Sequence, residues 1–198
     1  MISNGRNRSG SGNGRERILK AALGVFSARG FRAGSLNDIA EASGLTRAGL
    51  LHYYPNKQAV LLALMEQRDT KLHVLQPGTD RTLLQLLEDM EELTAHVLEN
   101  RAMVQLAHIL TAEASGEEHP AKEWVAQRYS ALRAVMADAV RRSLVAGELR
   151  ADTDPEAFAA LVLAVAEGAE NQWLLSPETV NPVAVIRQLR LLCEAARP

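Results

Sequence analysis

Apolar residues recur at helical spacing along almost the whole chain, and no stretch sustains the period-two alternation typical of a strand. Ile18, Ala22 and Phe26 fall on one face of a first helix, which we expect from about Arg15 to Ala28 and which Gly30 closes. Further apolar stripes continue to the C-terminus, separated by turns rich in glycine and proline. The pattern predicts an all-α fold of about nine helices.

Two short helices joined by a glycine follow this first helix. Ser35 can cap the first of them, Gly44 can end it with a positive φ, and Thr46 can cap the second. Pro55 keeps Tyr54 out of the helical region and so ends the second helix. This layout is typical of a helix-turn-helix, whose second helix lies in the major groove of DNA.

Charge is divided unevenly along the chain. Up to residue 57, nine lysines and arginines stand against three acidic residues, whereas the remaining residues carry thirteen against twenty-one. The glycine- and serine-rich residues 1–13 are expected to form a disordered basic arm. A basic N-terminal region followed by an acidic remainder indicates that the N-terminal region binds nucleic acid and that the remainder has a different function.

The polar residues around the second short helix are the candidate DNA contacts. Arg47 can bond bidentately to guanine, and the hydroxyl of Thr46 suits a phosphate. Thr46 and Lys57 can equally be helix-capping residues, and Tyr53 can equally pack inside the protein. His52 can face a base, a phosphate or solvent. The predicted DNA-binding residues are Ser35, Thr46, Arg47, His52, Tyr53 and Lys57.

The segment from Arg15 to Leu64 resembles the DNA-binding domain of the TetR family of ligand-responsive transcriptional regulators. RERILKAALGVFSARGF resembles the first helix of that domain, and SLNDIAEASGLTRAGLLHYYPNK resembles its helix-turn-helix. Gly49 stands where the family often has threonine, Leu51 where it often has a phosphate-binding tyrosine, and Tyr54 where it has a core phenylalanine. We therefore expect fewer groove contacts, or a heavier dependence on Arg47, His52, Tyr53 and the disordered arm.

The resemblance implies a second domain that binds an effector and pairs two copies of the chain. More loosely, GELRADTDPEAFAALVLAVAEGAENQWLL resembles the penultimate helix of some family members. In the family the last two helices form a four-helix bundle with a second copy, and the middle helices surround a ligand cavity. The predicted domains are a disordered arm at 1–13, a helix-turn-helix domain at 14–60, and an effector-binding and dimerisation domain at 61–198.

Apolar residues on two faces of the penultimate helix are compatible with that pairing. One face can meet the core of its own chain and the other a second subunit, because a single copy would leave a large apolar patch exposed. The predicted interface residues are Phe158, Leu163, Leu174, Val185, Leu189 and Leu192.

Polar and aromatic residues inside apolar helices are the candidates for ligand contact. The alternative is that His108 and the tryptophans belong to the core, and that Glu167 and Asn171 bond across the dimer interface. The predicted ligand-binding residues are Met65, His108, Trp124, Tyr129, Glu167 and Asn171.

No sequence motif points to catalysis. The five histidines show no paired ligand spacing, and neither a nucleophile elbow nor a Walker sequence is present, so we expect no catalytic residue, metal or cofactor. His119, beside Glu118 in a polar loop before Pro120, is expected to be solvated. No apolar run is long enough to span a membrane, and the single Cys193 fits a reducing cytoplasm.

The sequence therefore predicts a cytoplasmic, homodimeric repressor that a small apolar effector releases from a palindromic double-stranded DNA operator. A DNA-binding architectural protein without a ligand is the main alternative, and a helical enzyme is a further one.

Overall fold

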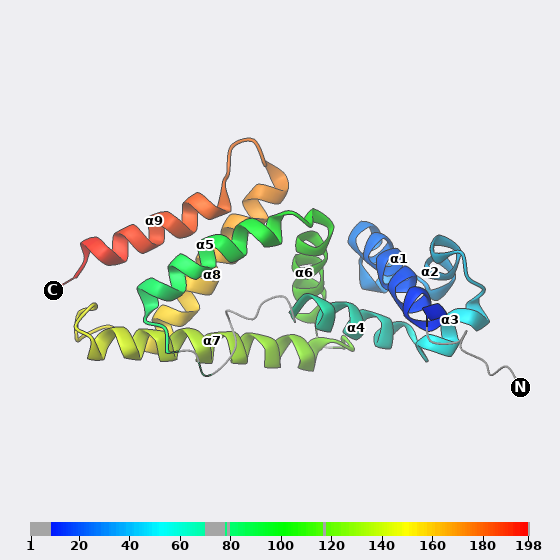
Figure 1. The fold of residues 1–198 in the computed structure, drawn as a ribbon, viewed down its shortest axis with the longest axis horizontal. Coiled ribbons are helices and arrows are strands. Elements are labelled where there is room, and N and C mark those ends of the chain that lie inside the picture. The colour runs from blue at the N-terminus through cyan, green and yellow to red at the C-terminus, as the bar shows by residue number, and fades with distance from the viewer. Residues whose placement is uncertain (1–8, 70–77, 79, 117, 198) are drawn as a thin grey trace, which may run out of the picture. The chain divides into compact units, whose positions relative to one another are not determined.

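The computed structural model describes residues 9–69, 78, 80–116 and 118–197. Over these residues the chain forms nine α-helices and no strand, which confirms the predicted all-α class (Figure 1). None of the described helices combines the length and the apolarity that crossing a membrane requires. The helices are α1 (Ser9–Ala33), α2 (Leu36–Ser43), α3 (Arg47–Tyr53), α4 (Lys57–Asp69), α5 (Leu83–Leu98), α6 (Arg101–Ala114), α7 (Lys122–Val145), α8 (Pro155–Leu175) and α9 (Pro182–Ala195).

The chain divides into two compact units. The first unit comprises residues 1–71 and 105–122, and the second comprises residues 72–104 and 123–198. Most of α6 thus groups with the helix-turn-helix, although the sequence pattern places all residues beyond 60 in the second domain.

The first unit is built around α1, against which α2, α3 and α4 pack. Phe26 of α1, Ile39 of α2 and Leu50 of α3 are fully buried between these helices. Removing each such side chain from water contributes about 1.5–3 kcal/mol to folding. Leu50 therefore fixes the short helix α3 to the rest of the unit, as the helix-turn-helix pattern predicts.

Helix α1 begins earlier than its apolar stripe indicates. It starts at Ser9, not near Arg15, so residues 9–13 of the predicted arm are helical, and residues 1–8 lie outside the described residues. Gly14 is buried against the ring of Tyr53, and this tertiary contact supports a glycine-rich turn whose intrinsic helix propensity is low.

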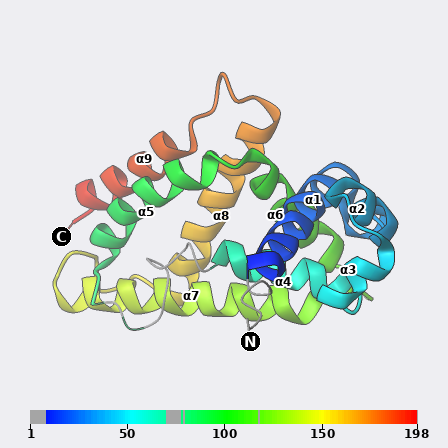
Figure 2. The same cartoon turned by 45° about the vertical axis from the view of Figure 1, so that its right-hand side comes forward.

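The second unit has its own core, shared by α5, α7, α8 and α9. Leu86, Met136, Val162 and Ile186, one from each of these helices, are fully buried. Helices α5 and α9 run side by side in both views (Figures 1 and 2). At one edge of this pair, the Glu91 carboxylate of α5 accepts hydrogen bonds from two arginines of α9, Arg187 at 2.8 Å and Arg190 at 2.9 Å.

Candidate nucleic-acid interface

The caps predicted for the helix-turn-helix are confirmed. Ser35 Oγ accepts the N–H of Asp38 at 3.2 Å, and Asp38 Oδ2 accepts the N–H of Ser35 at 3.0 Å, which forms a capping box. Gly44 ends α2 with a φ of 66°. Thr46 Oγ1 accepts the N–H of Gly49 at 3.0 Å and so starts α3.

The hydroxyl of Ser35 is fully engaged inside the protein. Besides accepting the N–H of Asp38, it donates to Asp38 Oδ2 at 2.6 Å. These hydrogen bonds from the hydroxyl and the N–H of Ser35, helped by the nearby Arg29, lower the pKa of Asp38, which therefore stays ionised at the helix N-terminus. The sequence predicts Ser35 both as a helix cap and as a DNA contact, and the structure shows it as a cap.

Helix α3 presents one face to solvent. Arg47, Ala48, Leu51 and His52 are exposed, whereas Leu50 is fully buried on the opposite side. We call these four exposed residues the recognition face. A cation at the first helical position and an imidazole one turn later can bond to base edges or phosphates, and Leu51 adds an apolar group between them.

Tyr53 packs against α1, as the alternative interpretation of this residue allowed. Its side chain is half-buried, and a Cβ atom on Gly14 would lie 2.5 Å from Tyr53 Oη. The His52 ring meets the Tyr53 ring edge-on, with centroids 5.7 Å apart. Gly14 therefore lets the end of α3 pack closely on α1, which places Tyr53 against α1 and beside His52 of the recognition face.

Two arginines of α1 stabilise the helix-turn-helix through contacts within the first unit. The sequence pattern does not single them out. The Arg17 guanidinium donates to the carbonyl oxygen of Ser43 and, at 3.3 Å, to that of Gly44. The Arg15 guanidinium lies 5.7 Å from the centre of the Tyr54 ring, which is buried where the family pattern has phenylalanine. Because α1 and the turn are far apart in sequence, no local pattern indicates these contacts.

Lys57 uses its ammonium group inside the protein. Nζ donates to the carbonyl oxygens of Phe31 at 2.7 Å, Arg32 at 3.2 Å and Gly34 at 2.9 Å, and lies 4.5 Å from the centre of the Phe31 ring. An ammonium has three donors, and here they are directed at the last turn of α1 and at Gly34 just after it. The geometry favours the capping role that the sequence left open for Lys57 over a phosphate contact.

The predicted ligand-binding residues are divided between the two units. Met65 is buried and His108 is half-buried in the first unit, whereas Trp124 is half-buried and Asn171 is exposed in the second.

The structure pairs two of these candidates within the second unit, because the Tyr129 hydroxyl of α7 donates to Glu167 Oε1 of α8 at 2.5 Å. Both side chains are partly buried. A carboxylate and a phenol held together in a largely apolar unit are able to orient a polar group of a small molecule.

The predicted interface residues also differ in burial. Leu163 lies in the core of its own unit and is only 8% exposed, which leaves little of its surface for a partner. Leu192 is 59% exposed, and Leu161 and Leu191, which the prediction omitted, are 48% and 44% exposed. Helices α8 and α9 thus expose several large leucines.

His119 contradicts the prediction that it is solvated, since its side chain is only 1% exposed. Its ring packs against the ring of Phe31, which lies far away in the sequence and which no local signal indicates. Among the described residues, no three histidine, cysteine, aspartate or glutamate side chains gather closely enough to hold a metal ion.

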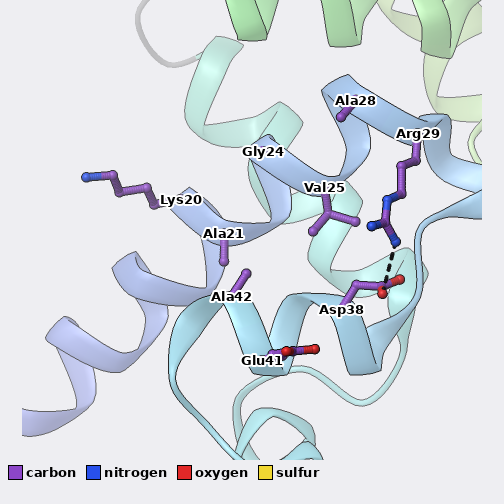
Figure 3. A pocket seen from close by; sticks show the side chains of 9 residues that line it. All are labelled: Lys20, Ala21, Gly24, Val25, Ala28, Arg29, Asp38, Glu41 and Ala42. Atoms are coloured by element: carbon purple, nitrogen blue, oxygen red, sulfur yellow. Dashed lines mark ion pairs between the residues drawn. The ribbon is translucent and has the colours of Figure 1, made fainter.

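An open groove of about 560 Å³ runs between α1 and α2 in the first unit (Figure 3). Small residues such as Gly24, Ala28 and Ala42 line it, and the Arg29–Asp38 ion pair, with a 3.1 Å separation, lies along it. None of the predicted ligand-binding residues lines this groove. Both charge signs occur among the residues that line it.

Two family models match the chain. Residues 18–64 match the model of bacterial regulatory proteins of the tetR family, and residues 86–197 match the model of the C-terminal region of BetI-type transcriptional repressors. The second match alone covers more than half of the chain.

Individual relatives agree with these matches. The probable HTH-type transcriptional regulator ArpR of Pseudomonas putida is 27% identical over 178 residues, which cover 84% of this chain and 83% of that protein. RutR of Escherichia coli K12 is 44% identical over 50 residues, 25% of this chain and 24% of that protein. These relatives are transcriptional regulators.

Solved structures share the fold. GusR of Salmonella enterica superposes with a TM-score of 0.70 at 25% identity, covering 93% of this chain and 95% of that one. The SmeT–triclosan complex superposes with a TM-score of 0.73 at 22% identity, covering 92% and 90%.

Proposed function

Because the chain belongs to the tetR family of bacterial regulatory proteins, we propose that it represses transcription from a palindromic operator and releases that DNA when a small, mainly apolar effector binds. The observation that carries the proposal is the recognition face, an exposed α3 surface on a fully capped helix-turn-helix. The matched families contain transcriptional regulators and not enzymes.

The recognition face supplies the base and phosphate contacts in this proposal. Arg47 is the residue that would read a guanine, because it is exposed at the N-terminal end of α3. His52 lies one to two turns further along and would contact the DNA backbone, whereas Tyr53 packs against α1 and supports His52. Thr46 and Ser35 hold the two helices in place through their caps, and the capping geometry of Lys57 gives it the same supporting role.

A second copy of the chain would pair through α8 and α9. The exposed side chains of Leu161, Leu191 and Leu192 support this assignment, because a monomer would leave these leucines in water. Two-fold symmetry in the protein requires two-fold symmetry in the DNA, with half-sites about 34–36 Å or a multiple apart. The operator is therefore proposed to be a palindrome.

The effector is proposed to bind in the second unit, where Tyr129 and Glu167 would orient it. The half-buried Glu167 carboxylate, which already accepts the Tyr129 hydroxyl, would favour neutral or cationic compounds over anions. Solved relatives of this fold have been captured with triclosan and with choline, two ligands of different polarity. The fold alone therefore does not identify the effector.

Selection of bound duplexes from a random pool is the test of DNA binding. We expect a palindromic consensus that recurs upstream of the gene for this chain or of a neighbouring gene. Compounds that raise the melting temperature of the protein would then be tested for release of the selected duplex. A protein that selects a site, but that no stabilising compound releases, would be an architectural DNA-binding protein instead.

The dimer is tested with a matched pair of variants. Leu192→Asp places a charge among the exposed leucines of α9, and we expect it to yield monomers and to weaken operator binding. Val145→Asp changes a residue that is 92% exposed at the end of α7 and should leave the dimer intact. Light scattering at micromolar concentration measures the oligomeric state of both variants. A monomeric wild-type protein would refute the proposed dimer.

A further inference from the structure

The C-terminal end of α1 meets α4 and the last turns of α6 in a cluster of polar contacts within the first unit. Gly30 interrupts α1 with a φ of 73°, and the N–H of Phe31 donates to Glu113 Oε2 at 3.1 Å. A Cβ atom on Gly30 would lie 2.5 Å from Glu113 Oε1, so a side chain at this position would force the carboxylate to shift. We call Gly30, Phe31, Lys57, Glu113 and His119 the junction.

His119 is the buried titratable group of the junction. Its Nδ1 accepts the N–H of Ala121 at 3.2 Å, so the proton of the neutral ring is assigned to Nε2. Nε2 lies 3.5 Å from Glu113 Oε2, the same oxygen that accepts the N–H of Phe31. The ring also meets the Phe31 ring edge-on, with centroids 5.2 Å apart. One carboxylate thus faces both the end of α1 and the buried imidazole.

The surroundings of His119 keep it neutral. Burial is the largest influence and lowers the pKa of its imidazole, and the cations Arg32 and Lys57 lower it further, whereas the Glu113 carboxylate partly opposes them. Arg32 belongs to the end of α1, Lys57 to α4 and Glu113 to α6, so the charges that act on the ring come from three helices.

We propose that the junction is a proton-sensitive latch, in which protonation of His119 loosens the end of α1 from α6 and thereby lowers DNA affinity. A protonated imidazole carries hydrogens on both nitrogens, so Nδ1 could no longer accept the N–H of Ala121 and would oppose it, donor to donor. The ring or the turn at Ala121 must then move. Glu113 faces the same ring, and any shift of its carboxylate weakens its bond to Phe31.

The direction of the pH effect follows from linkage. A histidine whose pKa is lowered in the closed junction binds fewer protons there than when it is released. The junction is therefore fully closed above the ordinary histidine pKa of about 6.5 and loses stability as the pH falls below it. Opening of the junction also affects the helix-turn-helix, because α2 and α3 pack on α1 and the junction holds the end of α1.

The test compares DNA affinity at about pH 7.5 and about pH 5.5 for three proteins, and it rests on the proposed DNA binding. In His119→Asn the amide oxygen can still accept the N–H of Ala121, but the side chain does not titrate. His96→Asn is the control, since His96 is an exposed histidine paired with Glu99 at 3.2 Å. We expect acidification to weaken the wild type and His96→Asn at least about fivefold more than His119→Asn.

The comparison isolates His119, because His119→Asn keeps every other histidine of the wild type. A difference in pH dependence between the two proteins therefore comes from His119. Glu113→Gln keeps an oxygen for the N–H of Phe31 but removes the charge that favours protonated His119, so the loss of affinity should move to lower pH. Equal pH dependence of the wild type and His119→Asn would overturn the proposal.

A measurement without DNA separates this inference from the proposed function. Imidazole nitrogen NMR of the wild-type protein should show the neutral Nε2–H tautomer for His119, and a pKa below the ordinary histidine value of about 6.5. A His119 pKa at or above the ordinary histidine value, or an Nδ1–H tautomer, would refute the latch even if DNA binding is found. If the NMR result is as expected but no duplex is selected, the latch geometry stands and the DNA-binding proposal fails.

Discussion

The recognition face of α3 and the junction at the end of α1 carry similar side chains but use them differently. Arg47 and His52 are exposed on α3, whereas the ammonium of Lys57 and the imidazole of His119 are directed at partners inside the first unit. A basic residue at a motif position is thus not evidence of DNA contact by itself. What decides its role is whether its donors already have acceptors in the fold.

Gly30→Ala should destabilise the protein more than any single substitution on the recognition face. An alanine at a φ of 73° is strained, and its Cβ atom would meet Glu113 Oε1 at 2.5 Å. Strain and overpacking together should cost about 2–5 kcal/mol in the free energy of unfolding, measured by denaturant titration. Gly24→Ala is the matched control, because its Cβ atom meets nothing within 4 Å and α1 is helical there, so stability should stay equal or rise.

Lys57→Met should destabilise the first unit without altering the salt dependence of DNA binding. Methionine keeps the apolar stem but leaves the carbonyl oxygens of Phe31 and Gly34 without their charged donor, which should cost about 1.5–3 kcal/mol in the free energy of unfolding. Lys20→Met, an exposed lysine of α1, is the control and should change stability little.

The salt dependence of the Lys57→Met variant decides between the two roles of Lys57. If Lys57 bound a phosphate, the slope of log affinity against log salt would flatten by about one unit. An unchanged slope with reduced stability supports the capping role, and the reverse result would restore Lys57 to the DNA interface.

Local signals were sufficient to predict the helix-turn-helix. The caps at Ser35 and Thr46 and the positive φ at Gly44 depend on residues at most a few positions away. They can therefore be predicted directly from the sequence. The carbonyls bound by Lys57 and the carboxylate bound by Phe31 come from distant segments. Propensity and spacing contain no information on such pairs, and His119 was misassigned to solvent for the same reason.

The second unit was harder to interpret because both faces of α8 are apolar. Leu161 and Leu163 are only two positions apart, yet Leu161 is 48% exposed and Leu163 is 8% exposed. Helical periodicity identifies the stripes but not which of two similar stripes meets the core of the same chain. Which leucines of α8 stay exposed depends on the core that α8 shares with α5, α7 and α9, and helical spacing does not give that core.

Arg47→Ala should weaken binding to the selected operator by about 1–3 kcal/mol and relax the sequence preference at one position of each half-site, if Arg47 reads a guanine. Its free energy of unfolding should stay unchanged, because the side chain is exposed. Arg133→Ala, which removes an exposed cation from α7 in the second unit, controls for net charge. Unaltered affinity and preference in Arg47→Ala would show that the recognition face is misassigned.

Gly14→Ala should have the smallest effect, and it tests whether α1 positions the end of α3. An alanine Cβ atom would sit 2.5 Å from Tyr53 Oη and 2.6 Å from Tyr53 Cζ, so the ring must turn away. The rotation should cost about 0.5–1.5 kcal/mol, which the better helix propensity of alanine offsets by up to about 1 kcal/mol. Stability therefore stays nearly level.

The consequence of Gly14→Ala should appear in DNA affinity instead, because His52 packs edge-on against the displaced Tyr53 ring. Adding Tyr53→Ala removes the clash, so in a double-mutant cycle the two substitutions should be less than additive in the free energy of DNA binding. Additive losses would mean that Tyr53 and Gly14 act independently. Gly24→Ala again serves as the control, since it adds the same methyl group to α1 where the groove leaves room for it.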